Sequence, residues 1–318
     1  MWHFRPDFCT AVLFVIVSIY AVRAVDEAIP LNAFPFVTSH DAASGEIDEA
    51  RDHVVADWTR TQPVGLVGQL DCGSRAFDYR PYLSRDGVLL AHHGPVVIHK
   101  PMQESLKEIS SWLSAPENLE EMVIMYITDC DGIDAYECIE ETMDLLNSND
   151  VYYIDNCEDV DGLTYGDAKN LGRLKTGGSL LSVIGCVDEN YDVSIACYGY
   201  DPKYVCYDDE SSKIAFQKID DYMHYVTFTD PSVSTHLWMA QAHWQSDAYS
   251  ISMGTLHNSS VIEDSNRSDL NNWVLQQLHE NKWDYLNLLE LDNVCNQGPA
   301  IQEVLLQSVM EGLNKSGR

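Results

Sequence analysis

Apolar runs of strand length alternate with amphipathic helical segments along most of this chain, and this alternation limits the possible folds more than any other feature. The sequence predicts strands at residues 34–40, 75–81, 87–93, 122–128, 180–186, 224–229, 237–244 and 285–291. Apolar residues recurring at three and four positions predict helices at 46–60, 103–114, 135–147, 164–172, 212–222, 268–280 and 298–313. Strands that alternate with helices form parallel sheets covered by helices, so we expect an α/β protein.

Eight predicted strands over about 290 residues match a single (β/α)8 TIM-type barrel. The barrel is expected to be irregular, because only a short turn separates the strands at 75–81 and 87–93. A parallel pair needs a longer crossover than that. No repeat, low-complexity tract or Pro/Gly-rich linker divides the chain. We therefore expect one barrel domain over residues 25–318.

The first 24 residues have a different character. Arg5 precedes an apolar run at 11–21, and the small residues Val22 and Ala24 follow it. This is the layout of a secretory signal peptide cleaved after Ala24. An N-terminal anchor is the alternative, although the run is short for a membrane span. The sequence predicts a secreted, extracellular protein.

Cysteine usage agrees with export. Without Cys9 eight cysteines remain, and none forms a CxxC pair, which argues against zinc knuckles and thioredoxin-like redox sites. An even number in an exported chain favours structural disulfides, up to four, with the pairing left open. Sequons at Asn258, Asn266 and Asn314 indicate surface glycosylation, with unused tripeptides as the alternative.

The formal net charge of −31 narrows the range of partners. A phosphate polymer requires a basic patch and none is visible, so nucleic acid is not an expected partner. Non-specific adhesion to anionic membranes is disfavoured for the same reason, and we expect only peripheral membrane contact. Most acids are scattered, as at 188–192 and 207–210, and we interpret nearly all of them as solvated surface. The oligomeric state is left open.

Reactive side chains lie at the ends of five predicted strands. Catalytic groups of a (β/α)8 barrel project from the carboxyl ends of its strands. A single strand-end histidine is more often a hydrogen-bonded structural residue, whereas five such ends at one face indicate a site. The side chains are His40 and Asp41, Asp78 and Arg80, His92 and His93, Asp129 and Asp131, and Asp292.

The motifs around these residues resemble those of the X-domain-type, phospholipase C-like phosphodiesterases. They are most similar to the metal-independent, bacterial-type phosphatidylinositol-specific phospholipases C. The matching stretches are SHDAAS (39–44), GSRAFDYRPY (73–82), DGVLLAHHGP (86–95) and LELDNV (289–294). The specific match covers about a third of the chain, and the ordered combination carries it, since HHGP alone would not.

The resemblance implies a two-histidine reaction. The substrate's own neighbouring hydroxyl attacks the phosphate and gains from proximity, so a base must take its proton and an acid must protonate the departing alkoxide. Imidazoles suit both tasks near neutral pH. By resemblance His40 is the base, oriented by Asp292, and His93 is the acid, supported by Asp78. His92 should face away from the mouth, since adjacent strand residues point oppositely.

The resemblance also assigns the phosphate-binding charge. Arg80 binds the non-bridging oxygens, and Asp41 holds both Arg80 and the attacking hydroxyl. Metal-dependent relatives carry Glu-x-Asp on this strand to bind Mg²⁺ or Ca²⁺. This chain has Asp-Tyr-Arg there, so no metal and no cofactor are expected. Asp129 and Asp131 keep a metal-dependent alternative open.

The substrate contacts depart from the bacterial pattern. Bacterial-type enzymes place a lysine on the fourth strand and an arginine on the fifth, where this chain has Thr128 or Asp129 and Gly185 or Cys186. We expect the headgroup contacts to include Thr128, Asp129, Gln241 and His243, with a buried core histidine as the alternative for His243.

The leading hypothesis is a secreted phosphoric diester hydrolase or lyase acting on phosphatidylinositol or glycosylphosphatidylinositol-type lipids through a cyclic inositol phosphate. One alternative is a metal-dependent glycerophosphodiesterase or sphingomyelinase D-like enzyme. The other is a secreted barrel that binds inositol phosphate or glycolipid without turnover. The intact histidine pair argues against the last.

Overall fold

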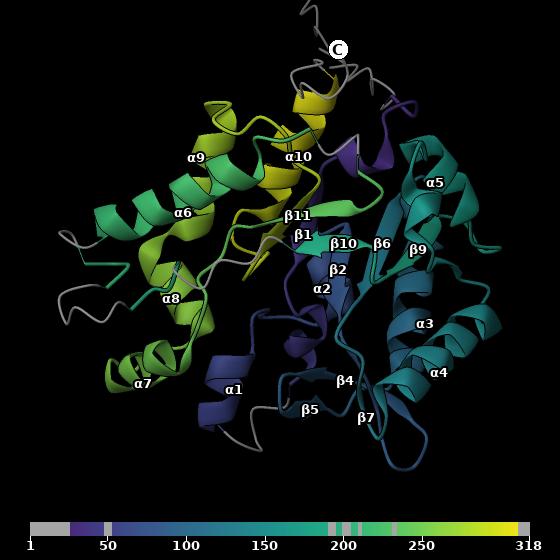
Figure 1. The fold of residues 1–318 in the computed structure, drawn as a ribbon, viewed down its shortest axis with the longest axis horizontal. Coiled ribbons are helices and arrows are strands. Elements are labelled where there is room, and N and C mark those ends of the chain that lie inside the picture. Colours follow the sequence, from purple (N-terminus) through teal and green to yellow (C-terminus); the bar gives the residue numbers. More distant parts are fainter. Residues whose placement is uncertain are drawn as a thin grey trace, which may run out of the picture.

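An eight-stranded sheet of parallel strands forms the centre of the structure (Figure 1), in the order β10-β11-β12-β1-β2-β6-β9-β8. The structure is a computed structural model that describes residues 26–47, 53–189, 195–198, 205–208, 212–230 and 234–310. The strands are β1 (Phe36–Ser39), β2 (Ala76–Tyr79), β6 (Met122–Ile127), β8 (Tyr152–Ile154), β9 (Ser179–Ile184), β10 (Val187–Glu189), β11 (Leu237–Gln241) and β12 (Leu288–Leu291). The predicted signal peptide and the sequon at Asn314 lie outside the described residues.

The sheet curls back on itself through one bent segment. β9 pairs with β6 and β8, and β10 pairs with β11, yet only Gly185 and Cys186 separate β9 from β10. Gly185 has φ +66, a left-handed conformation that glycine adopts without a steric penalty. One continuous stretch therefore joins both sides of the sheet, and the predicted irregular (β/α)8-type fold is confirmed.

Helices surround the curled sheet. Figure 1 shows α3, α4 and α5 on one side of it, and α6, α8, α9 and α10 on the other. The helices are α1 (His53–Thr59), α2 (Leu66–Asp71), α3 (Met102–Leu113), α4 (Ala135–Ser148), α5 (Tyr165–Leu171), α6 (Ser212–Val226), α7 (Ala248–Leu256), α8 (Val261–Ser268), α9 (Leu270–His279) and α10 (Gly298–Met310). Short 3-10 turns cover η1 (Leu31–Ala33), η2 (Ala42–Glu46), η3 (Pro116–Asn118) and η4 (Cys157–Val160). Within the described part of the chain, no helix is long and apolar enough to cross a membrane.

Local chemistry explains where several elements form. All six residues of β6 and all six of β9 are buried, as expected for parallel strands covered on both faces. Asp134 caps α4 by accepting hydrogen bonds from the backbone amides of Tyr136 and Glu137. Thr164 and Asp167 form a reciprocal capping box at the start of α5.

The strand predicted at 87–93 does not belong to the barrel. A second, four-stranded sheet has the order β5-β4-β3-β7 and consists of β3 (Pro81–Leu83), β4 (Leu89–His93), β5 (Val96–Ile98) and β7 (Asp131–Gly132). β4 pairs antiparallel with β3 and β5, which a short turn permits. This sheet lies beside the carboxyl end of β2, because β3 begins two residues after β2 ends.

The prediction of a strand at 224–229 is wrong. Residues up to Val226 are the last turns of α6. Ile219, Tyr222, Met223 and Val226 are buried at the three- and four-residue spacing of a helix face. Tertiary packing thus outweighs the strand preference of the β-branched and aromatic residues there.

The eight cysteines beyond the predicted signal peptide form four disulfides. The pairs are Cys72–Cys295, Cys130–Cys138, Cys157–Cys186 and Cys197–Cys206. The first joins the end of α2 to the loop before α10, and the third anchors the bend between β9 and β10. The prediction of structural disulfides is confirmed, and such bonds are typical of oxidising, extracellular compartments.

Candidate active site

His40 and Asp41 follow β1 directly, at the carboxyl edge of the sheet. Asp41 has φ +43, a left-handed conformation that aspartate tolerates better than most residues. Its backbone amide donates to Asp78 Oδ2 at 3.1 Å. Thr61 and Gln62 both donate to the carbonyl of His40, at 2.7 and 3.2 Å. The turn that presents His40 is therefore held from both sides.

Asp292 fixes the tautomer of His40. Its Oδ1 lies 2.8 Å from His40 Nδ1, so Nδ1 carries the proton that the carboxylate accepts. The other ring nitrogen, Nε2, lies 3.1 Å from Asp41 Oδ2. His40 is 15% exposed at its side chain, and Asp292 is buried. The predicted pairing of His40 with Asp292 is therefore present.

Arg80 bridges two buried carboxylates. Its Nε lies 2.9 Å from Asp41 Oδ1, and its Nη2 lies 2.8 Å from Asp78 Oδ2. Burial alone would raise the pKa of Asp78, but the Arg80 guanidinium outweighs it and holds that pKa below its ordinary range. The Asp78 carboxylate consequently stays ionised, and both carboxylates fix the guanidinium at the mouth of the sheet.

His93 reaches the site from the second sheet. Its Nδ1 lies 2.7 Å from the carbonyl oxygen of Thr59, which can only accept, so Nδ1 carries a proton. Its Nε2 lies 3.2 Å from Asp41 Oδ2. The expectation that Asp78 supports His93 is corrected, because Asp78 binds Arg80 while Asp41 and Thr59 hold the imidazole.

His92 points away from this centre, as expected. Its ring is buried and hydrogen-bonds the carbonyl oxygens of Gly94 and Asp129. The ring of His93 faces that of His40 edge-on, with 6.2 Å between centroids.

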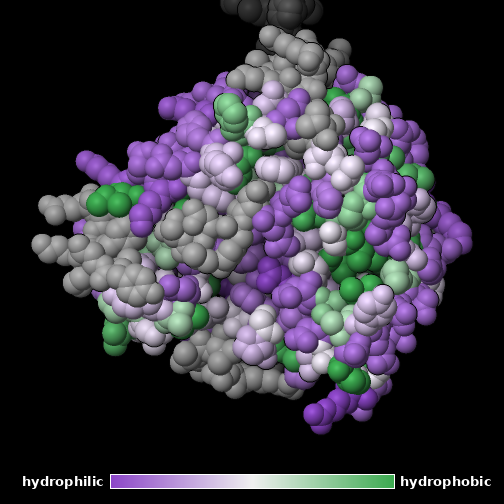
Figure 2. Space-filling view, in the orientation of Figure 1, coloured by the Kyte–Doolittle hydropathy of each residue, from purple (hydrophilic) through white to green (hydrophobic). Residues whose placement is uncertain are grey.

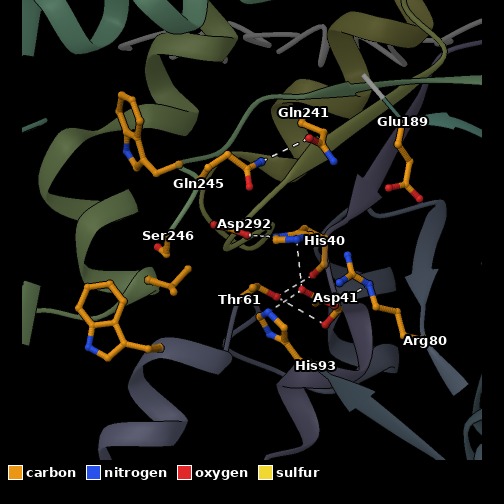
Figure 3. A pocket seen from close by; sticks show the side chains of 13 residues that line it. His40, Asp41, Thr61, Arg80, His93, Glu189, Gln241, Gln245, Ser246 and Asp292 are labelled. Atoms are coloured by element: carbon orange, nitrogen blue, oxygen red, sulfur yellow. Dashed lines mark hydrogen bonds and ion pairs between the residues drawn. The ribbon is translucent and has the colours of Figure 1, made fainter. Parts of the chain in front are cut away.

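The catalytic candidates line one pocket of about 460 Å³ (Figure 3). Strongly hydrophilic residues gather in the hollow near the middle of the face in Figure 2. The side chains that line the pocket are His40, Asp41, Trp58, Thr61, Arg80, His93, Glu189, Gln241, Trp244, Gln245, Ser246, Val261 and Asp292. Five of the six predicted catalytic residues are among them, and Asp78 lies behind Arg80.

Comparison with known proteins supports the resemblance seen in the motifs. No family model matches the chain. A curated 1-phosphatidylinositol phosphodiesterase of Staphylococcus aureus strain Newman is 31% identical over 101 residues, which cover 32% of this chain and 31% of that protein. The counterpart of strain NCTC 8325 / PS 47 is 31% identical over the same length and is covered to 29%. The sequence match thus spans under a third of these relatives.

The solved structures match over nearly the whole described fold. The phosphatidylinositol-specific phospholipase C of Listeria monocytogenes superposes with a TM-score of 0.59 at 17% identity, covering 89% of this chain and 96% of that one. A doubly substituted S. aureus phosphatidylinositol-specific phospholipase C gives a TM-score of 0.58 at 17% identity, covering 88% and 94%. This chain has the fold of the bacterial phosphatidylinositol-specific phospholipases C.

Within this phospholipase C fold, one of the four predicted substrate contacts lines the pocket and three do not. Gln241 lines the pocket. His243 does not, because it is completely buried behind His40. The Thr128 hydroxyl donates to Glu189 Oε1 at 3.3 Å, outside the pocket wall. The exposed Asp129 also lies outside it, and its carbonyl oxygen contacts His92.

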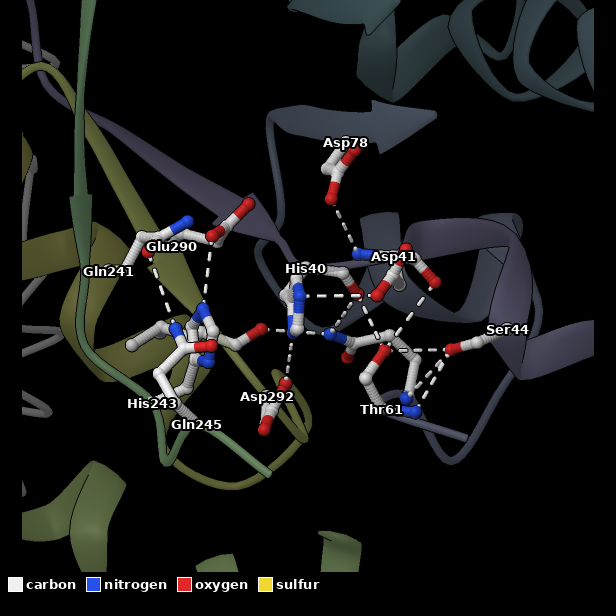
Figure 4. A network of polar contacts seen from close by, with 12 residues as sticks. His40, Asp41, Ser44, Thr61, Asp78, Gln241, His243, Gln245, Glu290 and Asp292 are labelled. Atoms are coloured by element: carbon white, nitrogen blue, oxygen red, sulfur yellow. Dashed lines mark hydrogen bonds and ion pairs between the residues drawn. The ribbon is translucent and has the colours of Figure 1, made fainter. Parts of the chain in front are cut away.

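The His243 ring stacks on His40 with 4.0 Å between centroids and 15° between planes (Figure 4). Its Nε2 lies 3.0 Å from Glu290 Oε2. Burial raises the pKa of Glu290 to about 8 although His40 and Arg80 oppose the rise. For His40, burial and His243 both lower the pKa. The carboxylates of Asp41, Asp292 and Glu290 raise it by more than that, so the pKa of His40 lies above its ordinary value of 6.5.

Two groups of side chains in the described part of the chain bring ligand atoms within 4.8 Å of one another. They are His40 with His243 and Asp292, and His40 with Asp41 and Asp78. Neither suits a divalent cation. His243 offers its Nε2 to Glu290, and the second group already surrounds the Arg80 guanidinium, whose positive charge would repel an ion. The donor set thus fits a fixed cation better than a metal.

Three residues in the pocket or behind it were not predicted from the sequence. Glu189 was interpreted as solvated surface, yet it lines the pocket, and burial raises its pKa. Thr59 contacts His93, which lies 34 residues away in the chain. Glu290 contacts His243, which lies 47 residues away. No local motif marks such pairs. The alternate positions of Gln241 and Gln245 in the sequence, by contrast, indicate a polyol pocket, and both residues line the pocket.

Proposed function

We propose that this chain is a secreted phosphoric diester hydrolase or lyase that cleaves phosphatidylinositol or glycosylphosphatidylinositol-type lipids through a cyclic inositol phosphate. The observation that supports it most is the placement of Asp41 between two imidazoles, with Nε2 of His40 at 3.1 Å and Nε2 of His93 at 3.2 Å. Arg80 lies beside them at 2.9 Å. The similarity to proteins named 1-phosphatidylinositol phosphodiesterase supports the same activity.

His40 serves as the general base in this proposal. Its Nε2 takes the proton of the headgroup hydroxyl next to the phosphate, and that oxygen then attacks phosphorus. Asp292 stabilises the imidazolium that forms, since it accepts from Nδ1 at 2.8 Å. Asp41 orients the attacking hydroxyl, because its Oδ2 lies next to the same nitrogen.

His93 serves as the general acid. The bond between phosphorus and the lipid oxygen breaks, and His93 Nε2 donates its proton to the departing alkoxide. Arg80 donates to the non-bridging oxygens while negative charge builds on them. Asp78 keeps the guanidinium in place from the side away from the pocket. The cyclic phosphodiester is the product, and a water in place of the alkoxide would open it.

The wall across from Arg80 is proposed to bind the headgroup. It carries the amides of Gln241 and Gln245 and the hydroxyl of Ser246, and the carboxyl of Glu189 joins them from the side of the pocket where Arg80 lies (Figure 3). These groups donate to and accept from hydroxyls, as a polyol requires. Membrane contact in this proposal is peripheral.

Phosphorus NMR of the purified protein with phosphatidylinositol micelles tests this function, with and without EDTA. We expect a cyclic phosphodiester signal in both samples, and its loss in His40→Asn and His93→Asn. His279→Asn, an exposed histidine at the end of α9, is the matched control and should leave the signal unchanged. Loss of the signal with EDTA alone would favour the metal-dependent alternative. Binding without product from any phosphodiester would favour the non-catalytic one.

A further inference from the structure

A buried histidine–glutamate pair lies directly behind His40. His243 is 0% exposed and Glu290 is 1% exposed. They come from neighbouring strands, since Glu290 belongs to β12 and His243 follows β11 by two residues. Their side chains meet at 3.0 Å, and the His243 ring lies parallel to that of His40 (Figure 4).

Packing alone does not account for this pair. Nδ1 of His243 and Oε1 of Glu290 have no hydrogen-bond partner among the described residues. Buried polar atoms without partners cost free energy, and two apolar side chains of similar size would fill the same space without that cost. Neither residue lines the pocket, so neither has a role in the reaction as proposed above.

The face of the His40 ring is the surface that the other contacts leave open. Asp292 and Asp41 meet the two ring nitrogens at the ring edge, at 2.8 and 3.1 Å. Edge contacts leave the imidazole free to tilt about the line that joins them. The parallel ring of His243, 4.0 Å away, opposes that tilt, and Glu290 holds His243 in turn.

We propose that His243 and Glu290 are positioning residues for His40, with the His243 ring as the platform that fixes the plane of the His40 imidazole. The role rests on the proposed function, in which His40 takes the proton of the attacking hydroxyl. A general base is effective only when it points at that proton, so a small tilt lowers the rate of the chemical step.

The same pair acts on the charge of His40. His243 lowers the pKa of His40, whereas the three carboxylates described above raise it. Loss of the His243 imidazole should therefore raise the pKa of His40. The titratable and charged groups that face this centre from the surrounding elements are Asp41, Asp78, Arg80, His93, Glu189, Glu290 and Asp292.

The test compares His243→Ala with His243→Phe in turnover of phosphatidylinositol micelles. We expect His243→Ala to lower kcat by about 10²-fold, the effect of a small misplacement, with KM little changed. His243→Phe supplies a flat ring without a proton and should restore most of that loss. Leu289→Ala is the control, because Leu289 precedes Glu290 in β12, pairs with Val37 and Ala240 and belongs with them to a core cluster that does not include His40. It should lower the melting temperature and leave kcat within about threefold.

A second readout does not depend on turnover. Titration of the His40 ring signals by NMR in the wild type and in His243→Phe should show a higher pKa in the variant. An unchanged His40 titration, a kcat for His243→Ala equal to that for Leu289→Ala, or equal losses in the Ala and Phe variants would each overturn the role. If the wild type produces no cyclic phosphate but the titration shifts, the proposed reaction fails and the positioning contact stands.

Discussion

Replacement of Arg80 by lysine tests whether the geometry of the guanidinium, beyond its charge, drives the proposed reaction. In the structure Nε and Nη2 are committed to Asp41 and Asp78, at 2.9 and 2.8 Å. The fork of five N–H groups has donors left for the phosphate after these contacts. A lysine ammonium has three donors at one point, so it cannot reach both carboxylates and the phosphate oxygens at once.

The size of the effect follows from what is lost. Removal of one donor to a developing oxyanion lowers kcat by about 10²–10³-fold, and we expect Arg80→Lys to fall in that range. KM should change less, because the lost contact strengthens only as charge builds on the phosphate. Arg80→Met removes the charge as well and leaves two carboxylates of 1% exposure without a cation. We expect it to lower the free energy of unfolding by about 3 kcal/mol.

Initial rates of cyclic phosphate formation give kcat and KM, and urea unfolding followed by circular dichroism gives the stability. Comparison of the lysine and methionine variants separates the loss of geometry from the loss of charge. A kcat for Arg80→Lys within threefold of the wild type would refute the argument, as would a change confined to KM. Full stability of Arg80→Met would show that the two carboxylates do not depend on this cation.

Three further predictions concern stability and the headgroup. The double substitution Cys72→Ser and Cys295→Ser removes the disulfide between two cysteines that are 223 residues apart in the sequence. It should lower the free energy of unfolding by about 4–5 kcal/mol in non-reducing urea titrations. The Glu290 pKa of about 8 exceeds its unfolded value of 4.5. The stability that Glu290 contributes is therefore complete below pH 4.5 and is lost as the pH rises through 8. The melting temperature should fall over this pH range in the wild type, and should fall less in Glu290→Gln. Glu189→Ala removes a pocket carboxyl, and we expect KM for phosphatidylinositol to rise about tenfold with kcat nearly unchanged.

The sequence predicted the fold best where burial is uniform. β6 and β9 were located to within two residues, because every position in them is buried and apolar runs of six have few other interpretations. β8 and β10 were missed, since each has three residues with mixed polarity, Tyr152–Ile154 and Val187–Glu189. The assignment of β4 to the barrel failed because its partners, β3 and β5, are set by pairing that a local pattern does not encode.

The sequence predicted the site residues that stand in local motifs and missed those that depend on distant contacts. His40, Asp41 and Arg80 stand in short motifs with fixed spacing, so the sequence alone brought them together. The partner of His93 could not be read in this way, because the Thr59 carbonyl is a backbone group 34 residues distant. Glu290 lies inside the LELDNV motif, yet its role depends on His243, which only the pairing of β11 with β12 brings near.

Asp41 explains how three basic groups share one pocket. Its Oδ2 lies 3.1 and 3.2 Å from the Nε2 atoms of His40 and His93, and its Oδ1 lies 2.9 Å from Arg80. An imidazolium and a guanidinium this close together would repel each other without an anion between them. The carboxylate reaches this position because the backbone turns left-handed at φ +43 and its amide is tied to Asp78. The chain itself therefore holds in place the positive charge that a phosphodiester requires, because Asp41 contacts all three basic groups.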